Sequence, residues 1–450
     1  MAQALERPGP AASRRRAMES FELERPAGQS QQGGACAEDS LRSSGSASPL
    51  LEQGDGGRAQ EVSAAWRADR GEADGKKGEG GEGLLVHLTG TRFWLSIWIM
   101  ADHFLPGAGA FVDRANVAVN LFIIMSGFVT QWAYGSHDLQ PGRAIARFYV
   151  RRIGRVLLPT YLSMLAAALL MVTVLDKTVG VMHMLRCLCF LEPWREPEDW
   201  CPNGQTWTIA ALLPSWLLYP AWKRLVATVE AQGGAGALLA LLLGLWIVSF
   251  GPSLAVFAAG GGWITQRQHA FLYLWPPSQL ADFAIGVATA ALTRRHADEG
   301  PAALWRGHLA DVALAIALTV AMAVPPSGEH RGWEPLYNHG LALFLAAFLY
   351  GSCAAGGSGH AAALFSLKPT VWLGKYSFEV FLFQWPLYSL LEHLWLFWLT
   401  DYGIQKWHVA VVYMLAIFTL SGLYAELVEV PYVKWLKATT QSWVDQRSTN

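Results

Sequence analysis

From residue 84 onward, long apolar segments recur along the chain and are separated by short polar breaks. They lie near 88–105, 115–135, 156–175, 205–221, 236–257, 271–292, 309–325, 337–354, 370–398 and 408–429. A helix of about 20 apolar residues crosses the hydrocarbon core of a bilayer. The pattern therefore predicts an all-α fold, a polytopic membrane protein with about ten transmembrane helices. Several segments are nearer to about 17 residues, so one or two are expected to be half-spans or tilted helices.

The first 83 residues show no such periodicity. Stretches such as GDGGRAQ and DGKKGEGGEG cannot bury enough apolar surface to fold, and the uninterrupted apolar core of a cleavable signal peptide is missing. The sequence therefore predicts a disordered cytosolic tail over residues 1–83. A transmembrane domain over 84–437 and a short cytosolic C-terminal tail over 438–450 follow it.

The overall composition supports a membrane protein and argues against one that binds nucleic acid. Of 450 residues, 52% are hydrophobic, 15% are charged and 21 are Trp, which is too apolar for an ordinary soluble protein. The formal net charge of -1 supplies no field that attracts nucleic acid, and no block of Lys and Arg is interleaved with aromatic residues. The lipid bilayer is therefore the expected surrounding.

Basic residues in the polar breaks predict the orientation, because cytosolic loops retain Lys and Arg. With the N-terminus inside, the inner loops hold Arg143, Arg147, Arg151, Arg152, Arg155, Lys223, Arg224, Arg294, Arg295, Arg306, Lys368, Lys434, Lys437 and Arg447. The outer loops hold Arg114, Lys177, Arg186, Arg195, Arg267, Arg331 and Lys406, half as many. Both termini are therefore expected in the cytosol. Either the plasma membrane or an endomembrane fits this orientation.

The five cysteines show no spacing that is typical of a zinc or haem site, and no metal is expected. Cys187, Cys189 and Cys201 belong to one loop on the predicted outer side. In an oxidising compartment, Cys187 or Cys189 can pair with Cys201. The spacing does not choose between a disulfide and three free thiols.

The first apolar segment, TRFWLSIWIMADHF, contains ionisable residues, which cost a few kcal/mol each inside a membrane and usually mark a functional path. Arg92 and His103 are eleven residues apart, so on a helix they share one face, about 16 Å apart along the axis. Imidazole is well matched to general base catalysis near neutral pH. The alternative is an interfacial histidine that ends the helix. Whether Asp102 orients His103 stays open.

Three arginines gather in RFYVRRIGRVLLPTY, at the predicted cytosolic edge of the third segment. Arg152 and Arg155 stand three residues apart on one helical face, beside Arg151, and this spacing suits the binding of a phosphate group from two directions. A cluster that serves only the membrane topology is the alternative.

Further polar residues interrupt the apolar segments. Asn120 and Ser126 lie in NLFIIMSGF, where a Ser-Gly pair permits close helix packing. Lys375 and Glu379 lie one helical turn apart, which fits an ion pair at least as well as a catalytic role. Gln384 follows on the same segment and can donate and accept hydrogen bonds.

Structural capping is the expected role of Asp282, Glu426 and Glu429 near segment ends. The chain has no P-loop, no dinucleotide fingerprint and no HExxH motif. GGSGH at 356–360 lacks the closing glycine of a nucleophile elbow.

Taken in order, these pieces resemble the acyltransferase 3 family of integral-membrane O-acyltransferases over most of residues 88–437. The resemblance rests on Arg92 and His103 with ten residues between them, on VAVNLFIIMSGF and on FYVRRIGRVLLPTY. TWTIAALLPSWLLYP, LADFAIGVATAAL, LGKYSFEVFLFQWPLY and AELVEVPYVKWL follow in the family's order.

The resemblance implies an enzyme that takes an acyl group, commonly acetyl, from acyl-CoA on the cytosolic side and transfers it to a hydroxyl. The acceptor would be a carbohydrate, a lipid or another small molecule. By position, Arg92 and His103 would be the functional pair of the first span. Arg152 and Arg155, with Arg151 beside them, would approach the phosphates of the donor.

Two positions depart from the family. Leu212 stands where the family commonly has glutamate, and Gln384 stands where a histidine commonly precedes Trp-Pro. Asp102 or Glu379 would then have to supply the missing carboxylate, or the chemistry of this subfamily differs. The departures favour a second hypothesis, a non-catalytic membrane carrier or exporter with the same fold. A polytopic receptor or scaffold is a third.

Overall fold

The computed structural model describes residues 85–105, 109, 111–139, 142–195, 201–298, 304–323, 334–391, 393 and 406–445. The predicted disordered tail, residues 1–83 with Cys36 among them, lies outside the described residues, as do residues 446–450. Within the described ranges the regular elements are helices and no strand occurs, which confirms the all-α class.

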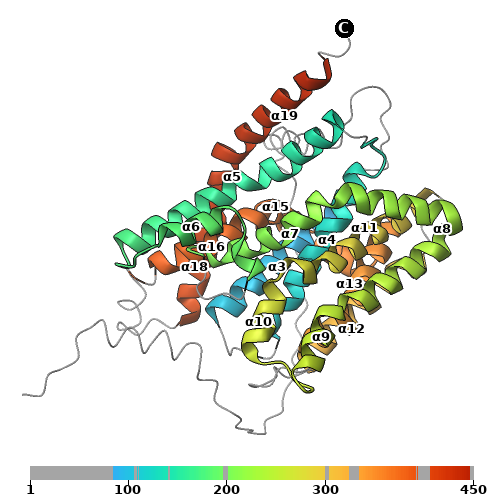
Figure 1. The fold of residues 1–450 in the computed structure, drawn as a ribbon, viewed down its shortest axis with the longest axis horizontal. Helices are drawn as coiled ribbons and strands as arrows, with labels where there is room; N and C mark the ends of the chain where they lie inside the picture. Colours follow the sequence, from blue (N-terminus) through green and yellow to red (C-terminus); the bar gives the residue numbers. More distant parts are fainter. Residues whose placement is uncertain are drawn as a thin grey trace, which may run out of the picture. The chain divides into compact units, whose positions relative to one another are not determined.

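The helices of the first half are α3 (Val86–Phe104), η1 (Val112–Arg114), α4 (Asn116–Tyr134), α5 (Arg143–Thr173), α6 (Val181–Leu188), η2 (Glu192–Trp194), η3 (Gly204–Thr206), α7 (Trp207–Leu217) and α8 (Tyr219–Ser249). Those of the second half are α9 (Gly251–Ala259), α10 (Gln266–Leu274), α11 (Pro276–Asp298), α12 (Leu304–Ala323), α13 (Glu334–Ala354), α14 (His360–Phe365), α15 (Lys368–Gly374), α16 (Ser377–Leu391), α18 (Lys406–Tyr424), the π-helical turn η5 (Ala425–Glu429) and α19 (Val430–Asp445) (Figure 1). Residues 438–445 of the predicted C-terminal tail are therefore helical.

Five helical stretches among the described residues are long and apolar enough to cross a membrane. They are Val112–Tyr134, Arg143–Thr173, Tyr219–Ala259, Leu304–Ala323 and His408–Gln441. At least one helix occupies each of the ten predicted segments. The helix α7, with 11 residues, is about half as long as a span requires, and α16 has 15. That about ten helices cross a bilayer stays a prediction.

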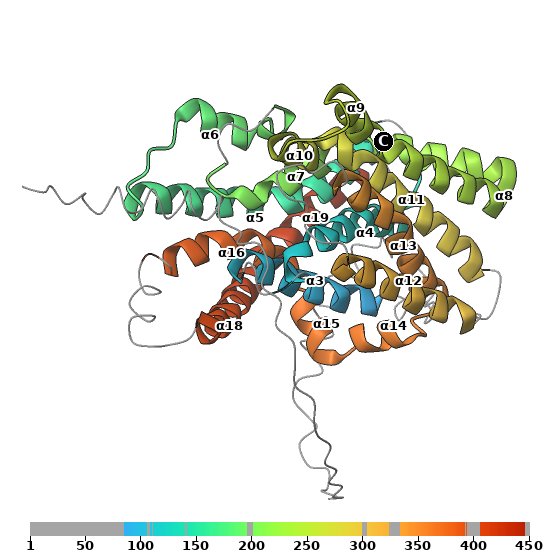
Figure 2. The same cartoon turned by 90° about the horizontal axis from the view of Figure 1, so that it is seen from below.

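The helices differ in how deeply they are buried. About two thirds of the most apolar part of α4 (67%) is inside the protein, against 17% for the stretch that joins α8 and α9. In Figure 2, α3 and α4 lie among other helices, whereas α6, α8 and α18 lie at the periphery. The peripheral helices expose large apolar side chains such as Leu243, Ile247 and Leu415, as lipid-facing surfaces do.

Glycines bring α4 and α11 into close contact, as the Ser-Gly pair in the second segment predicts. A Cβ atom on Gly127 would lie 2.0 Å from the carbonyl oxygen of Phe283, so no larger residue fits there. The two helices run parallel, because Asn120 and Asp282 line one pocket near their starts while Arg294 donates to the carbonyl of Trp132 near their ends. Polar residues near the two helix starts therefore lie at the same depth.

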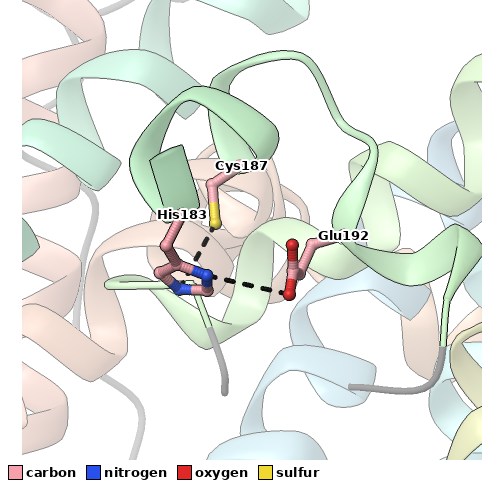
Figure 3. A group of neighbouring side chains, drawn as sticks. All are labelled: His183, Cys187 and Glu192. Atoms are coloured by element: carbon pink, nitrogen blue, oxygen red, sulfur yellow. Dashed lines mark hydrogen bonds and ion pairs between the residues drawn. The ribbon is translucent and has the colours of Figure 1, made fainter. Parts of the chain in front are cut away.

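A disulfide joins Cys187 to Cys201, and Cys189 is an exposed thiol. Of the two predicted pairings, the helix α6 selects the first, because Cys187 is buried on it. Figure 3 shows Cys187 with His183 and Glu192. His183 Nδ1 lies 3.7 Å from Glu192, which also accepts a hydrogen bond of 3.0 Å from Arg186 Nε.

The side chains of Figure 3 have the ligand types of a metal site, but their bonding indicates a structural role. The sulfur of Cys187 is held in the disulfide, and a metal ligand must be a thiolate. The carboxylate of Glu192 is already paired with Arg186. The cluster therefore holds α6 against η2.

Candidate functional site

A cavity of about 390 Å³ opens between α3, α4, α5, α7, α16 and η5. We call it the arginine cavity. Its wall is mostly apolar, but seven basic or acidic side chains line it. They are Arg92, Arg151, Arg152, Arg155, Lys375, Glu379 and Glu429. Five of these are basic and two are acidic, so the cavity favours an anionic occupant.

Arg152 is held at the cavity wall by two neighbours. Its Nη2 donates to Ser126 Oγ at 3.1 Å, and its guanidinium lies over the ring of Trp216, 5.3 Å from the ring centroid. The indole N–H of Trp216 donates to the same Ser126 oxygen at 3.1 Å. Ser126 therefore positions the guanidinium, whereas its neighbour Gly127 allows α4 and α11 to pack closely. The predicted candidates Arg152 and Ser126 act together.

Arg155 is held by a carboxylate that is distant in the sequence. Its Nε donates to Glu429 Oε1 at 3.0 Å, and the side chain of Glu429 is almost fully buried. Glu379 is hydrogen-bonded to Glu429, and Arg92 lies within electrostatic reach of both carboxylates. The expected capping role of Glu429 is wrong, because this residue lies on the π-helical turn and faces the cavity.

Lys375 lines the same cavity, but Glu379 interacts with Glu429 and Arg155 rather than with Lys375. The ion pair between Lys375 and Glu379 that their spacing suggested is therefore replaced by contacts of Glu379 with Glu429 and Arg155. Leu212, where the resemblance leads one to expect a glutamate, lies on the cavity wall. Glu379 and Glu429 supply carboxylates to the cavity in its place.

Arg151 stands at the edge of the cavity and is bound to α19. Its Nε donates to Thr440 Oγ1 at 2.8 Å, and its Nη2 donates to the carbonyl of Lys437 at 3.4 Å. Arg147, one turn earlier on α5, donates to Gln441 at 2.8 Å. The C-terminal helix therefore fixes the first part of the arginine motif, while Arg152 and Arg155 face inward.

His103 does not line the arginine cavity, although Arg92 on the same helix does. The imidazole is partly buried at the end of α3, and its Nδ1 lies 3.4 Å from Gln384 Oε1. The amide of Gln384 is fixed, since its Nε2 donates to the carbonyl of Phe381 at 3.0 Å. Oxygen therefore faces the imidazole, so Nδ1 carries the hydrogen and Nε2 keeps its lone pair. Asp102, next to His103, lies within electrostatic reach of Tyr273 on α10.

Asn120 belongs to a second, smaller pocket near the start of α4, with Asp282 and His339. His339 Nδ1 lies 3.3 Å from Asp282 Oδ2, and both side chains are buried. The expected capping role of Asp282 is wrong, because this carboxylate pairs with a histidine from another helix. The sequence gives a signal for Asp282, a charge in an apolar segment, but none for its partner.

Five long apolar helices indicate a membrane protein, and a cationic cavity lies among its helices. The comparison with known families gives the class a name. A family model described as "Acyltransferase domain" matches residues 86–426, and the chain belongs to this acyltransferase 3 family. Acyl transfer is the class of reaction that the family carries out.

Among characterised proteins, the chain is similar to "Acyltransferase MdmB" of Streptomyces mycarofaciens. The two are 23% identical over 265 residues, which is 54% of this chain and 65% of the relative. The match therefore spans just under two thirds of the relative's length. No solved structure matches the chain.

Proposed function

We propose that this protein is a membrane-embedded O-acyltransferase that uses acyl-CoA, with acetyl-CoA as the expected donor, and a hydroxyl-bearing acceptor. The arginine cavity is the observation that carries the proposal. Membership in the acyltransferase 3 family supports it. The carbohydrate, lipid or other small molecule that accepts the acyl group enters as a second substrate.

The donor is bound by the inward-facing arginines of α5. Coenzyme A carries phosphates, which guanidinium groups bind through charge-assisted hydrogen bonds. Arg152 and Arg155 lie one turn apart on the cavity wall, and Arg151 stands at its edge. The basic loops predict that this end faces the cytosol, where acyl-CoA is found. Arg92, which lines the same cavity, positions the donor through a further contact to its anionic groups.

The acceptor is activated by His103. Its Nε2 takes the proton of the hydroxyl while the hydroxyl oxygen attacks the thioester carbonyl. A C–O bond forms, the C–S bond breaks, and the proton passes to the departing thiolate of coenzyme A. The hydrogen bond from Nδ1 to Gln384 keeps the imidazole in the required tautomer, as a carboxylate does in a catalytic triad. Gln384 is a positioning residue in this scheme.

A second candidate function is a carrier that moves an acyl compound without chemistry. Two observations favour it: Leu212 replaces a carboxylate at the cavity wall, and His103 lies outside the cavity lining. A carrier leaves the thioester intact, whereas the enzyme releases free coenzyme A.

The test uses purified full-length protein in lipid nanodiscs with labelled acetyl-CoA and a panel of hydroxyl acceptors. The expected result is release of free coenzyme A in step with labelled ester, and no release with heat-denatured protein. Saturable acetyl-CoA binding with no coenzyme A release for any acceptor would contradict the enzyme and favour the carrier.

A further inference from the structure

A second polar pocket lies beside the arginine cavity and has no role in the chemistry above. Asn120, Gln279, Asp282, His339 and Tyr273 line it. They come from α4, from the consecutive helices α10 and α11, and from α13, so three separate parts of the sequence build one site. Asp282 is 1% exposed and His339 is 6% exposed. Burying a charged group costs desolvation free energy, so a buried carboxylate next to an imidazole suggests a functional role.

The pocket offers an unused hydrogen-bond acceptor. Asp282 Oδ2 faces His339 Nδ1 at 3.3 Å, but the buried Oδ1 of the same carboxylate has no hydrogen-bond partner among the described residues. An orphaned buried acceptor is rare in proteins, because leaving it unpaired costs free energy. A donor from outside the chain would satisfy it.

The size and charge of the pocket restrict what that donor is. The free volume is about 20 Å³, enough for one water-sized group. The carboxylate repels anions, and the imidazole Nδ1 beside it also has no hydrogen-bond partner among the described residues. A neutral hydroxyl fits best, because it can donate to Asp282 Oδ1 and accept from the N–H of His339 when Nδ1 carries the hydrogen.

The position of the pocket connects it to the donor cavity. Ile123 lines both spaces and is the wall between them. Asn120, Ile123 and Ser126 are three residues apart on one face of α4, so this face runs from the pocket to the arginine cavity over about 9 Å. Because α4 and α11 are parallel, the pocket lies toward the ends of these helices that are opposite the arginines of α5.

We propose that this pocket is the acceptor site, in which Asp282, His339 and Asn120 hold one hydroxyl of a neutral, polyhydroxylated acceptor that enters from the side opposite the donor. The proposal rests on the proposed function for the identity of the donor. The alternative is a buried ion pair that only ties α11 to α13.

Steady-state kinetics distinguish an acceptor site from a purely structural ion pair. With acetyl-CoA and glycerol or methyl β-D-glucopyranoside as the acceptor probe, Asp282→Asn keeps the shape of the side chain and removes the charge. We expect the acceptor KM to rise at least tenfold while the donor KM changes less than twofold. Thr289→Val, on the same helix and equally buried, is the control and should leave both KM values unchanged. An unchanged acceptor KM, or an equal rise in both KM values, would overturn the proposal.

Thiol labelling tests the access route without any acceptor. In a Cys36→Ser, Cys189→Ser background, Asn120→Cys and Ser126→Cys are exposed in sealed vesicles to a membrane-impermeant maleimide from either side. We expect Asn120→Cys to react only from the face opposite the arginines, and Ser126→Cys only from the arginine face, with acetyl-CoA protecting the second alone. No labelling of Asn120→Cys from the opposite face would overturn the proposal. If wild-type protein released no coenzyme A, the acyltransferase function would fail while this labelling result stayed decisive for the pocket.

Discussion

Two spaces meet at Ile123, and they differ in almost every property. The arginine cavity is large, about 390 Å³, and carries five basic side chains against two acidic ones. The pocket of Asp282 and His339 is about 20 Å³ and carries one carboxylate and two imidazoles, those of His339 and His269. One helix, α4, contributes Asn120 to the small space and Ser126 to the large one.

The contrast teaches how one bundle distinguishes two substrates. In the proposed function, the large cationic space selects a phosphate-bearing donor by charge, and the small space, which lacks excess positive charge, selects a hydroxyl by hydrogen bonding. In the same proposal, the separation would keep water from the thioester until the acceptor has arrived. His103 lines neither the arginine cavity nor the small pocket. Its replacement is therefore the strongest test of the proposed division between the two sites.

The largest expected effect follows from His103→Ala. Removal of a placed general base lowers the transfer rate by about 10²- to 10⁴-fold. Acetyl-CoA binding should be unchanged, because His103 does not line the donor cavity. Single-turnover transfer of labelled acetyl, together with equilibrium binding of acetyl-CoA, measures both. Undiminished transfer would remove His103 from the mechanism.

The next effect concerns the arginine cavity. Arg152→Ala removes a charge-assisted contact worth about 1.5–3 kcal/mol, so the donor KM should rise by about 10- to 150-fold while the acceptor KM stays the same. Arg147→Ala is the matched control, because this arginine lies on the same helix and bonds Gln441 outside the cavity. Equal shifts for both variants would mean that only the net charge of α5 matters.

Sequence patterns predicted the arginine cavity better than the small pocket. Arg152 and Arg155 share a helix and a face, so their spacing alone brings them together. Glu429, which accepts a hydrogen bond from Arg155, is 274 residues away, and no local sequence pattern predicts such a contact. The same holds for His339 and Asp282, which different helices bring together.

Burial, rather than spacing, resolved the choices that the sequence left open. Cys187 is buried on α6 whereas Cys189 is exposed just beyond its end, so the fold selects the first for the disulfide. Arg92 and His103 share a helix as the sequence predicts, yet only Arg92 lines the cavity, because α16 covers the far end of α3 with Gln384.

A smaller effect is expected from the residue that orients His103. Gln384→Leu removes the acceptor for Nδ1, and one neutral hydrogen bond contributes about 0.5–1.5 kcal/mol, so kcat should fall by about two- to tenfold with little change in either KM. Gln384→Glu keeps an acceptor oxygen at that position and should restore most of kcat. If both variants lost activity equally, Gln384 would act through packing and not through the imidazole.

The smallest effect is expected at the wall between the two spaces. Ile123→Ala shortens the side chain that separates them, so water from the small pocket gains access to the thioester. Hydrolysis of acetyl-CoA without an acceptor should then rise severalfold above a low background, measured as free thiol release. Ile124→Ala is the matched control, since the neighbouring side chain is equally buried but lines neither space. Both variants lose similar packing energy, so a rise confined to Ile123→Ala reports the opened wall, whereas equal hydrolysis in both would show that the two spaces are not adjacent in the working enzyme.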